Sequence, residues 1–77
     1  MKDIKVLGSG CANCKTTTGL IEQVAREKGV AVNIDKIQDM QAIIAYGVLA
    51  TPGVVVDGKV VHAGGVPQRD RIEAWLA

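Results

Sequence analysis

Hydrophobic and polar positions alternate along the chain in a way that changes from one segment to the next. Residues 3–7 place Ile4 and Val6 between charged neighbours, which predicts a short strand. Residues 12–28 carry apolar side chains every three or four positions, which is typical of an amphipathic helix. The predicted helical stripe consists of Thr17, Leu20, Ile21, Val24, Ala25 and Lys28. Gly29 follows as a C-terminal stop.

The central part of the chain predicts a strand followed by a short helix. Residues 30–35 alternate between apolar and polar side chains, as in a half-buried strand. Asp39 can cap a helix that runs to Tyr46, and Gly47 would end it. The side chains expected to face inward are Met40, Ile43 and Ile44.

The C-terminal part predicts a hairpin and a final helix. Residues 54–56 are three consecutive valines, which suits a strand that is covered on both faces. Asp57-Gly58 is a strong signal for a two-residue turn, and residues 60–63 would form the returning strand. Gly64-Gly65 would end that strand. Pro67 suits the first turn of a helix, and Ile72, Trp75 and Leu76 would share its inner face.

The predicted order of elements is βαβαββα, which indicates an α/β fold. A helix joins the first two strands, so they should be parallel with a right-handed crossover, and the last two should be antiparallel. We therefore expect a four-stranded mixed sheet with helices on both faces. With 77 residues, positions 1–77 should form a single domain.

Composition and charge narrow the classes of function. The chain contains no Phe, one Trp and one Tyr, so its core must be aliphatic. A net charge of +1, dispersed along the chain, gives no support for nucleic-acid binding. No apolar run approaches the ~18 residues of a membrane span. Residues 1–5 lack the apolar stretch of a signal peptide, so we expect a cytoplasmic protein, and nothing demands more than a monomer.

Two cysteines, Cys11 and Cys14, lie where the first strand gives way to the long helix. Free N–H groups and the helix dipole stabilise a thiolate there, and cysteine pKa values fall from ~8.5 to ~3.5–7.5 at such positions. The two sulfurs would share one helical turn, close enough to bond. We expect Cys11, at the exposed tip, to be the attacking thiol, and Cys14, on the packed side, to resolve the mixed disulfide. Such a dithiol requires no metal or organic cofactor.

Other interpretations of the cysteine pair remain open at this point. Two thiolates are half of a tetrahedral zinc site, and a two-thiolate site for soft Cu(I) is a further possibility. The one histidine, His62, is the obvious third ligand, although a single His near a strand end is more often structural. A redox-regulated interaction module without turnover, or two incidental thiols, would also fit.

Three segments together resemble a known family. They are residues 8–15 (GSGCANCK), 46–52 (YGVLATP) and 57–61 (DGKVV). This pattern is similar to the minimal thioredoxin-like proteins of archaea and bacteria, the small redox-active disulfide proteins of the thioredoxin superfamily. Small copper-transport domains also carry CxxC at a strand–helix junction, but they have a different order of elements and a Met-Thr pair before the first cysteine.

The resemblance implies a thiol–disulfide oxidoreductase and a set of site residues. Pro52 should follow a cis peptide bond, with Thr51 presenting its backbone to a substrate segment next to Cys11. Ala12 and Asn13, between the cysteines, would complete the substrate-contacting residues. The partners implied are a disulfide-containing protein substrate and an upstream reductant. That reductant would be a flavoprotein similar to thioredoxin reductase, or glutathione.

The chain departs from typical thioredoxins at several positions. Gly10 stands where they have Trp, and Ala12-Asn13 replaces Gly-Pro. Lys5 occupies the place of a buried Asp, so the proton acceptor for Cys14 is unassigned. Lys5 is either a solvated strand residue or an electrostatic aid to a thiolate. Lys15 is likewise either a solvated helix residue or a group for thiolate stabilisation and docking.

Gly64-Gly65 has a second interpretation through the related glutaredoxins. Those proteins carry a glycine pair before a helix whose N-terminus binds a carboxylate of glutathione, although the acidic residue expected next is replaced here by Val66-Pro67. A glutathione-dependent reductase is therefore an alternative function. We expect Tyr46 and Trp75 to serve in packing.

Overall fold

The computed structural model describes residues 2–8 and 12–77 of the chain. Its elements follow the predicted βαβαββα order. They are β1 (Lys2–Leu7), α1 (Ala12–Lys28), β2 (Val32–Ile37), α2 (Met40–Ala45), β3 (Gly53–Val56), β4 (Lys59–Ala63) and α3 (Arg69–Trp75). Within the described residues, no helix is long and apolar enough to cross a membrane.

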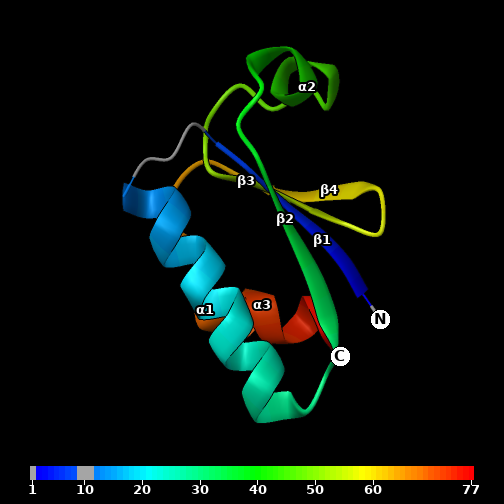
Figure 1. Cartoon of the computed structure of the whole chain (residues 1–77). Coiled ribbons are helices and arrows are strands. Elements are labelled where there is room, and N and C mark those ends of the chain that lie inside the picture. Colours follow the sequence, from blue (N-terminus) through cyan, green and yellow to red (C-terminus); the bar gives the residue numbers. More distant parts are fainter. Residues whose placement is uncertain (1, 9–11) are drawn as a thin grey trace.

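The four strands form one mixed sheet in the order β2-β1-β3-β4. β1 is parallel to β2 and antiparallel to β3, and β3 is antiparallel to β4. Helices α1 and α3 lie together on one side of the sheet, while α2 lies at one end of the molecule (Figure 1). The predicted four-stranded mixed sheet with its helices is confirmed.

The alternation of strand side chains divides the core into two clusters. On one face of the sheet, Ile4 and Val6 of β1 pack with side chains of α1 and α3, such as Ile21 and Ile72. On the other face of the sheet, Leu7 of β1 packs with Ile43 of α2. The second cluster comprises Leu7, Ile43, Val48 and Val55, with Tyr46 against it. Helices therefore cover both faces, as predicted.

Helix α1 has the predicted bounds and contributes buried side chains to the core. Ile21, Val24 and Ala25 of the predicted stripe are buried. The hydroxyl groups of Thr17 and Thr18 donate to the carbonyls of Asn13 and Cys14, at 2.7 and 3.0 Å. These bonds allow two threonines to be buried without unsatisfied hydroxyls. Gly29 ends the helix with φ +68°.

The hairpin also agrees with its sequence signal. Asp57 and Gly58 have φ values of +50° and +85°. Positive φ at both central residues is the geometry of the hairpin turn that Asp-Gly favours. Val54 and Val55 of β3 are fully buried, each on a different face of the sheet.

Two details of helix α2 and strand β2 differ from the predictions. Strand β2 starts and ends two residues later than expected. Asp39 does cap α2, accepting from the Gln41 N–H at 3.1 Å. However, Met40 and Ile44 are 59% and 61% exposed, and only Ile43 is buried. A helix of six residues presents one narrow stripe to the sheet, so its neighbouring apolar side chains face outward.

The start of the last helix also differs. Helix α3 begins at Arg69, after an extended N-cap residue, Gln68. Pro67 is buried in the preceding segment and is not in the first turn. Trp75 is partly buried against the core, in agreement with the packing role expected for it.

Candidate active site

Cys14 lies in the first turn of α1, which begins at Ala12. Cys14 is only 6% exposed, and its sulfur is part of a disulfide bond. Cys11, the expected attacking residue, lies outside the described residues. The position of Cys14 on the packed side of the helix agrees with the place expected for it. Cys14 lies in the first turn of the helix, where the helix dipole favours negative charge.

Gly8, the residue after β1, allows the strand end to approach Cys14. A Cβ atom added to Gly8 would overlap the Sγ atom of Cys14 and would lie 3.6 Å from the Cβ atom of Thr51. The Gly8 N–H donates to the Ile37 carbonyl at 2.9 Å, which ties this position to the end of β2. Gly8 therefore brings the cysteine and the Thr51 loop together. The sequence analysis included Gly8 only as the first residue of the motif at residues 8–15.

The peptide bond between Thr51 and Pro52 is cis, as the resemblance implied. Pro52 is fully buried, whereas Thr51 is exposed. The Pro52 carbonyl accepts from the Gly64 N–H at 2.9 Å, so the loop is anchored to the end of β4. Because Thr51 and Cys14 both lie near the Gly8 position, this loop borders the site of Cys14.

Ala12 and Asn13 form the start of α1, and both are exposed. Their carbonyl groups accept from the hydroxyls of Thr16 and Thr17, at 3.0 and 2.7 Å. These bonds tighten the first turn, and both side chains remain on the surface next to Cys14. Their contact with a substrate stays a prediction.

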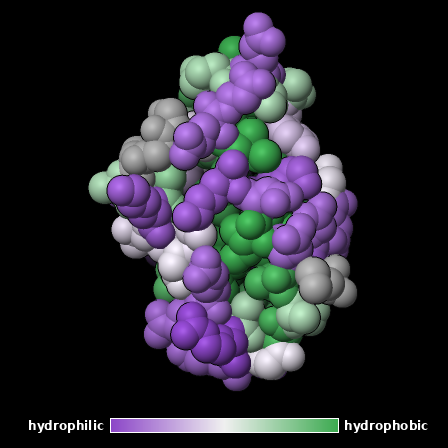
Figure 2. All heavy atoms as spheres, in the orientation of Figure 1, coloured by the Kyte–Doolittle hydropathy of each residue, from purple (hydrophilic) through white to green (hydrophobic). Residues whose placement is uncertain are grey.

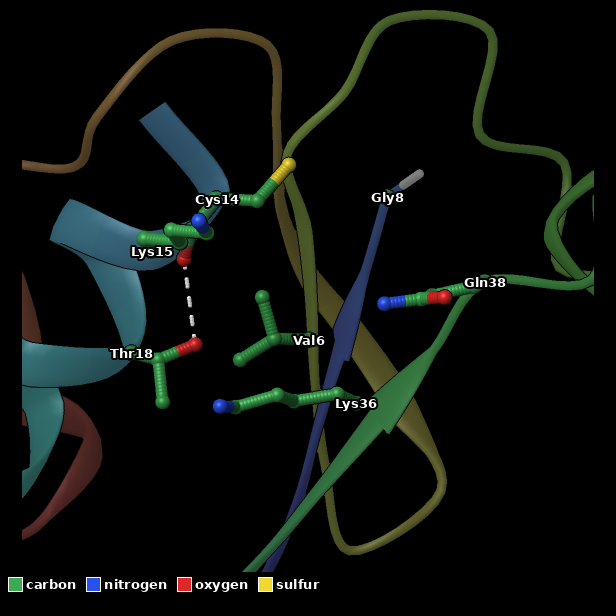
Figure 3. Close-up of a pocket in the computed structure, with 7 residues that line it drawn as sticks. All are labelled: Val6, Gly8, Cys14, Lys15, Thr18, Lys36 and Gln38. Atoms are coloured by element: carbon green, nitrogen blue, oxygen red, sulfur yellow. Dashed lines mark hydrogen bonds between the residues drawn. The ribbon is translucent and has the colours of Figure 1, made fainter. Parts of the chain in front are cut away.

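A small cavity, open to solvent, lies beside Cys14 between α1 and the ends of β1 and β2. The Cys14 sulfur points toward Gly8, and Lys36 extends from β2 below Val6 toward the helix (Figure 3). The residues that line it are Val6, Gly8, Cys14, Lys15, Thr18, Lys36 and Gln38. None of these seven residues is acidic. Sequence reasoning missed Lys36 and Gln38, which the register of β2 against β1 places at this edge.

Lys5 does not serve as the cation beside Cys14. It alternates with Ile4 and Val6 along β1, so it lies on the face away from α1. Its ammonium group is 3.1 Å from the Asp3 carboxylate and 3.8 Å from that of Asp35. The hydrogen bond to Asp3 raises the pKa of Lys5 above its usual value. The lysine that shares a cavity with Cys14 is therefore Lys36, with Lys15 beside it.

The residues considered for metal or glutathione binding are placed elsewhere. His62 donates through Nε2 to the Gly65 carbonyl at 2.9 Å, and its ring centroid is 6.1 Å from that of Trp75. Among the described positions, no three His, Cys, Asp or Glu side chains come together as metal ligands could. Gly64-Gly65 does not lead directly into a helix, because α3 starts at Arg69.

Comparisons with known proteins agree on one family. The family model described as "Thioredoxin domain" matches residues 2–77. A thioredoxin of Methanothermobacter thermautotrophicus is 32% identical over 77 residues and covers the whole of both chains. A thioredoxin of Methanocaldococcus jannaschii is 32% identical over 73 residues, which are 95% of this chain and 84% of that one.

A solved structure supports the same fold. The crystal structure of oxidised mitochondrial thioredoxin 3 from Saccharomyces cerevisiae superposes with a TM-score of 0.68 at 17% identity. The match covers 97% of this chain and 76% of the yeast chain. The fold and the cis-proline beside a buried half-cystine define a thioredoxin-like thiol–disulfide oxidoreductase. With the family match over nearly the whole sequence, the chain belongs to the thioredoxin domain family.

Proposed function

We propose that this protein reduces disulfides in other proteins through a Cys11–Cys14 dithiol, with residues 1–77 acting as one cytoplasmic domain. The observation that carries the proposal is the junction at Gly8. There the buried Cys14 and the cis Thr51–Pro52 loop meet within contact distance of one backbone position. This arrangement supports the proposal, because Cys14 lies near a backbone segment to which an extended chain can add.

The reaction has two exchange steps. The Cys11 thiolate attacks one sulfur of the substrate disulfide, and the other substrate sulfur leaves as a thiolate that takes up a proton. The Cys14 thiolate then attacks the Cys11 sulfur of the mixed disulfide and releases the second substrate thiol. Two electrons and two protons have passed to the substrate, and a Cys11–Cys14 disulfide remains. A flavoprotein reductase or glutathione would restore the dithiol.

The surrounding residues have distinct roles in this scheme. The N-terminal end of α1 stabilises the thiolate that forms at the start of the helix. Thr51, with Pro52 holding its backbone in place, offers peptide groups to which an extended substrate segment can add as a strand does. Ala12 and Asn13, both exposed on the first turn, contact the same segment. The mechanism uses no metal or organic cofactor.

Thiol counting by mass after equilibration in glutathione redox buffers tests the proposal. A cooperative two-thiol transition between about −180 and −300 mV is expected of such an oxidoreductase. Substrate turnover should be lost in Cys11→Ser. Cys14→Ser should accumulate a mixed disulfide, because the first step proceeds and the second cannot. Thiols that never pair reversibly, or full turnover by Cys11→Ser, would refute the mechanism.

A further inference from the structure

The cavity beside Cys14 carries positive charge that no neighbouring carboxylate balances. Lys15 and Lys36 both line it, and no acidic residue does. Within residues 2–8 and 12–77, neither lysine forms an ion pair. Lys5 pairs with Asp3 and Asp35, and Arg69 pairs with Glu27 and Glu73, whereas the remaining described cations form no ion pair either. Lys15 and Lys36 differ from the other unpaired cations in that both line the cavity next to Cys14.

The shape and lining of the cavity fit a side chain with an apolar stem and an anionic end. Val6 and Gly8 are apolar residues of the lining, and the Gln38 side chain, which also lines the cavity, can donate from its amide (Figure 3). Lys15 comes from α1 and Lys36 from β2, so the two ammonium groups approach from different elements. A carboxylate entering the cavity would find donors from both elements.

Exposed apolar side chains at the same end of the molecule favour a protein as the source of that carboxylate. Leu49 is 95% exposed just before the Thr51–Pro52 loop, and Met40 and Ile44 are exposed on α2. Helix α2 and this loop lie at the same end of the molecule as the start of α1 (Figure 1). In the face shown in Figure 2, hydrophobic side chains form a band between hydrophilic ones. Apolar contacts of this kind suit a polypeptide segment better than a small anion.

We propose that this cavity is a subsite for an acidic residue of the protein substrate, so that the enzyme prefers disulfides flanked by Glu or Asp. The inference rests on the proposed function, because it requires substrate to be joined to Cys11. Cys14 must reach that mixed disulfide to resolve it. The adjoining substrate residues are therefore held next to the cavity in whose wall Cys14 lies.

The test compares three disulfide peptides that differ at one position beside a cysteine, with Glu, Gln or Lys there. At low ionic strength, kcat/KM should be about two- to tenfold higher for the Glu peptide than for the Gln peptide, as two exposed ion pairs would give. The Lys peptide should be slowest. The preference should shrink at 1 M salt, where the screening length is only ~3 Å.

Matched variants locate the effect. Lys36→Gln and Lys15→Gln should each lower the ratio of kcat/KM for the Glu peptide to kcat/KM for the Gln peptide. Lys59→Gln is the control, because Lys59 is an exposed lysine at the β3–β4 hairpin. It should retain the full preference. The same preference in Lys36→Gln as in the unchanged protein would overturn the assignment of this cavity.

The outcomes separate this inference from the proposed function. Equal rates for all three peptides would overturn the subsite and leave the oxidoreductase intact. Faster reduction of oxidised glutathione than of the Glu peptide would show that a small anionic disulfide is the ligand, and would overturn the choice of a protein. No reduction of any disulfide would refute the proposed function and, with it, the subsite.

Discussion

Replacing Gly8 by alanine probes the close approach between β1 and Cys14. The new Cβ would overlap the Cys14 Sγ, while its distances to the Cys14 Cβ (3.4 Å) and the Thr51 Cβ (3.6 Å) are ordinary contacts. The sulfur belongs to a buried residue, so it has little room to move away. Overpacking of this kind costs about 1–3 kcal/mol. It is partly offset by about 0.4–1 kcal/mol from the stiffer unfolded chain.

The expected net loss of unfolding free energy for Gly8→Ala is therefore about 1–2 kcal/mol. Urea denaturation measures it as a lower midpoint, by roughly 1–2 M for a slope near 1 kcal/mol per M. Gly19→Ala makes the same chemical change inside α1, where an added Cβ meets nothing within 4 Å. That control should raise the stability by about 0.5–1 kcal/mol, because alanine favours the helix.

The same substitution in a Cys14→Ala protein tests whether the loss of stability comes from the Cys14 sulfur. In Cys14→Ala the sulfur is absent, so Gly8→Ala should no longer destabilise the protein when each comparison is made within its own background. If Gly8→Ala were as stable as the unchanged protein, the close approach would not constrain this site. If its cost persisted in Cys14→Ala, the sulfur would not be the cause.

Three further predictions concern stability. Ile43→Ala should lower the free energy of unfolding by about 2–4 kcal/mol and Ile44→Ala by less than about 0.5 kcal/mol, since the two residues are 2% and 61% exposed. Equal urea midpoints for the two variants would contradict this prediction. The hydrogen bond from Arg69 lowers the pKa of Glu27 below its ordinary 4.5. The α1–α3 ion pair should therefore stabilise the fold at neutral pH, and its contribution should be lost as the pH falls below 4.5 through the folded-state pKa. If Glu27→Gln lowered the free energy of unfolding as much below pH 4.5 as at neutral pH, this prediction would be refuted. Gly58→Ala should cost about 1 kcal/mol in thermal unfolding, because residue 58 has φ +85°; an unchanged melting temperature would argue against that strain.

Local signals in the sequence predicted much of the fold. The bounds of α1, the Asp39 cap and the Asp57-Gly58 turn depend on residues close together in the chain, and all three are confirmed. The order of elements then left few sheet topologies, because a helix between two strands requires a parallel crossover. The two-cysteine motif and the Thr-Pro pair indicate the family from the sequence alone.

Tertiary packing decided the features that depend on distant residues. Which face of α2 is buried, and where α3 begins, follow from contact with the sheet rather than from periodicity. The proximity of Gly8 to Cys14 and Thr51 joins positions more than forty residues apart in the sequence. No local pattern predicts such a contact, because the distance between elements is set by how they pack.

The charged residues near Cys14 show most clearly which features the sequence predicts and which depend on tertiary packing. The sequence placed Lys5 at the position of a buried acid and left its role open. The alternation of β1 turns Lys5 to the α2 side, where carboxylates bind it. The pairing of Val6 with Lys36 puts another lysine beside Cys14. The sequence by itself predicted the order of the elements and the family. Strand register, a relation between two segments, decided which charges surround that pair.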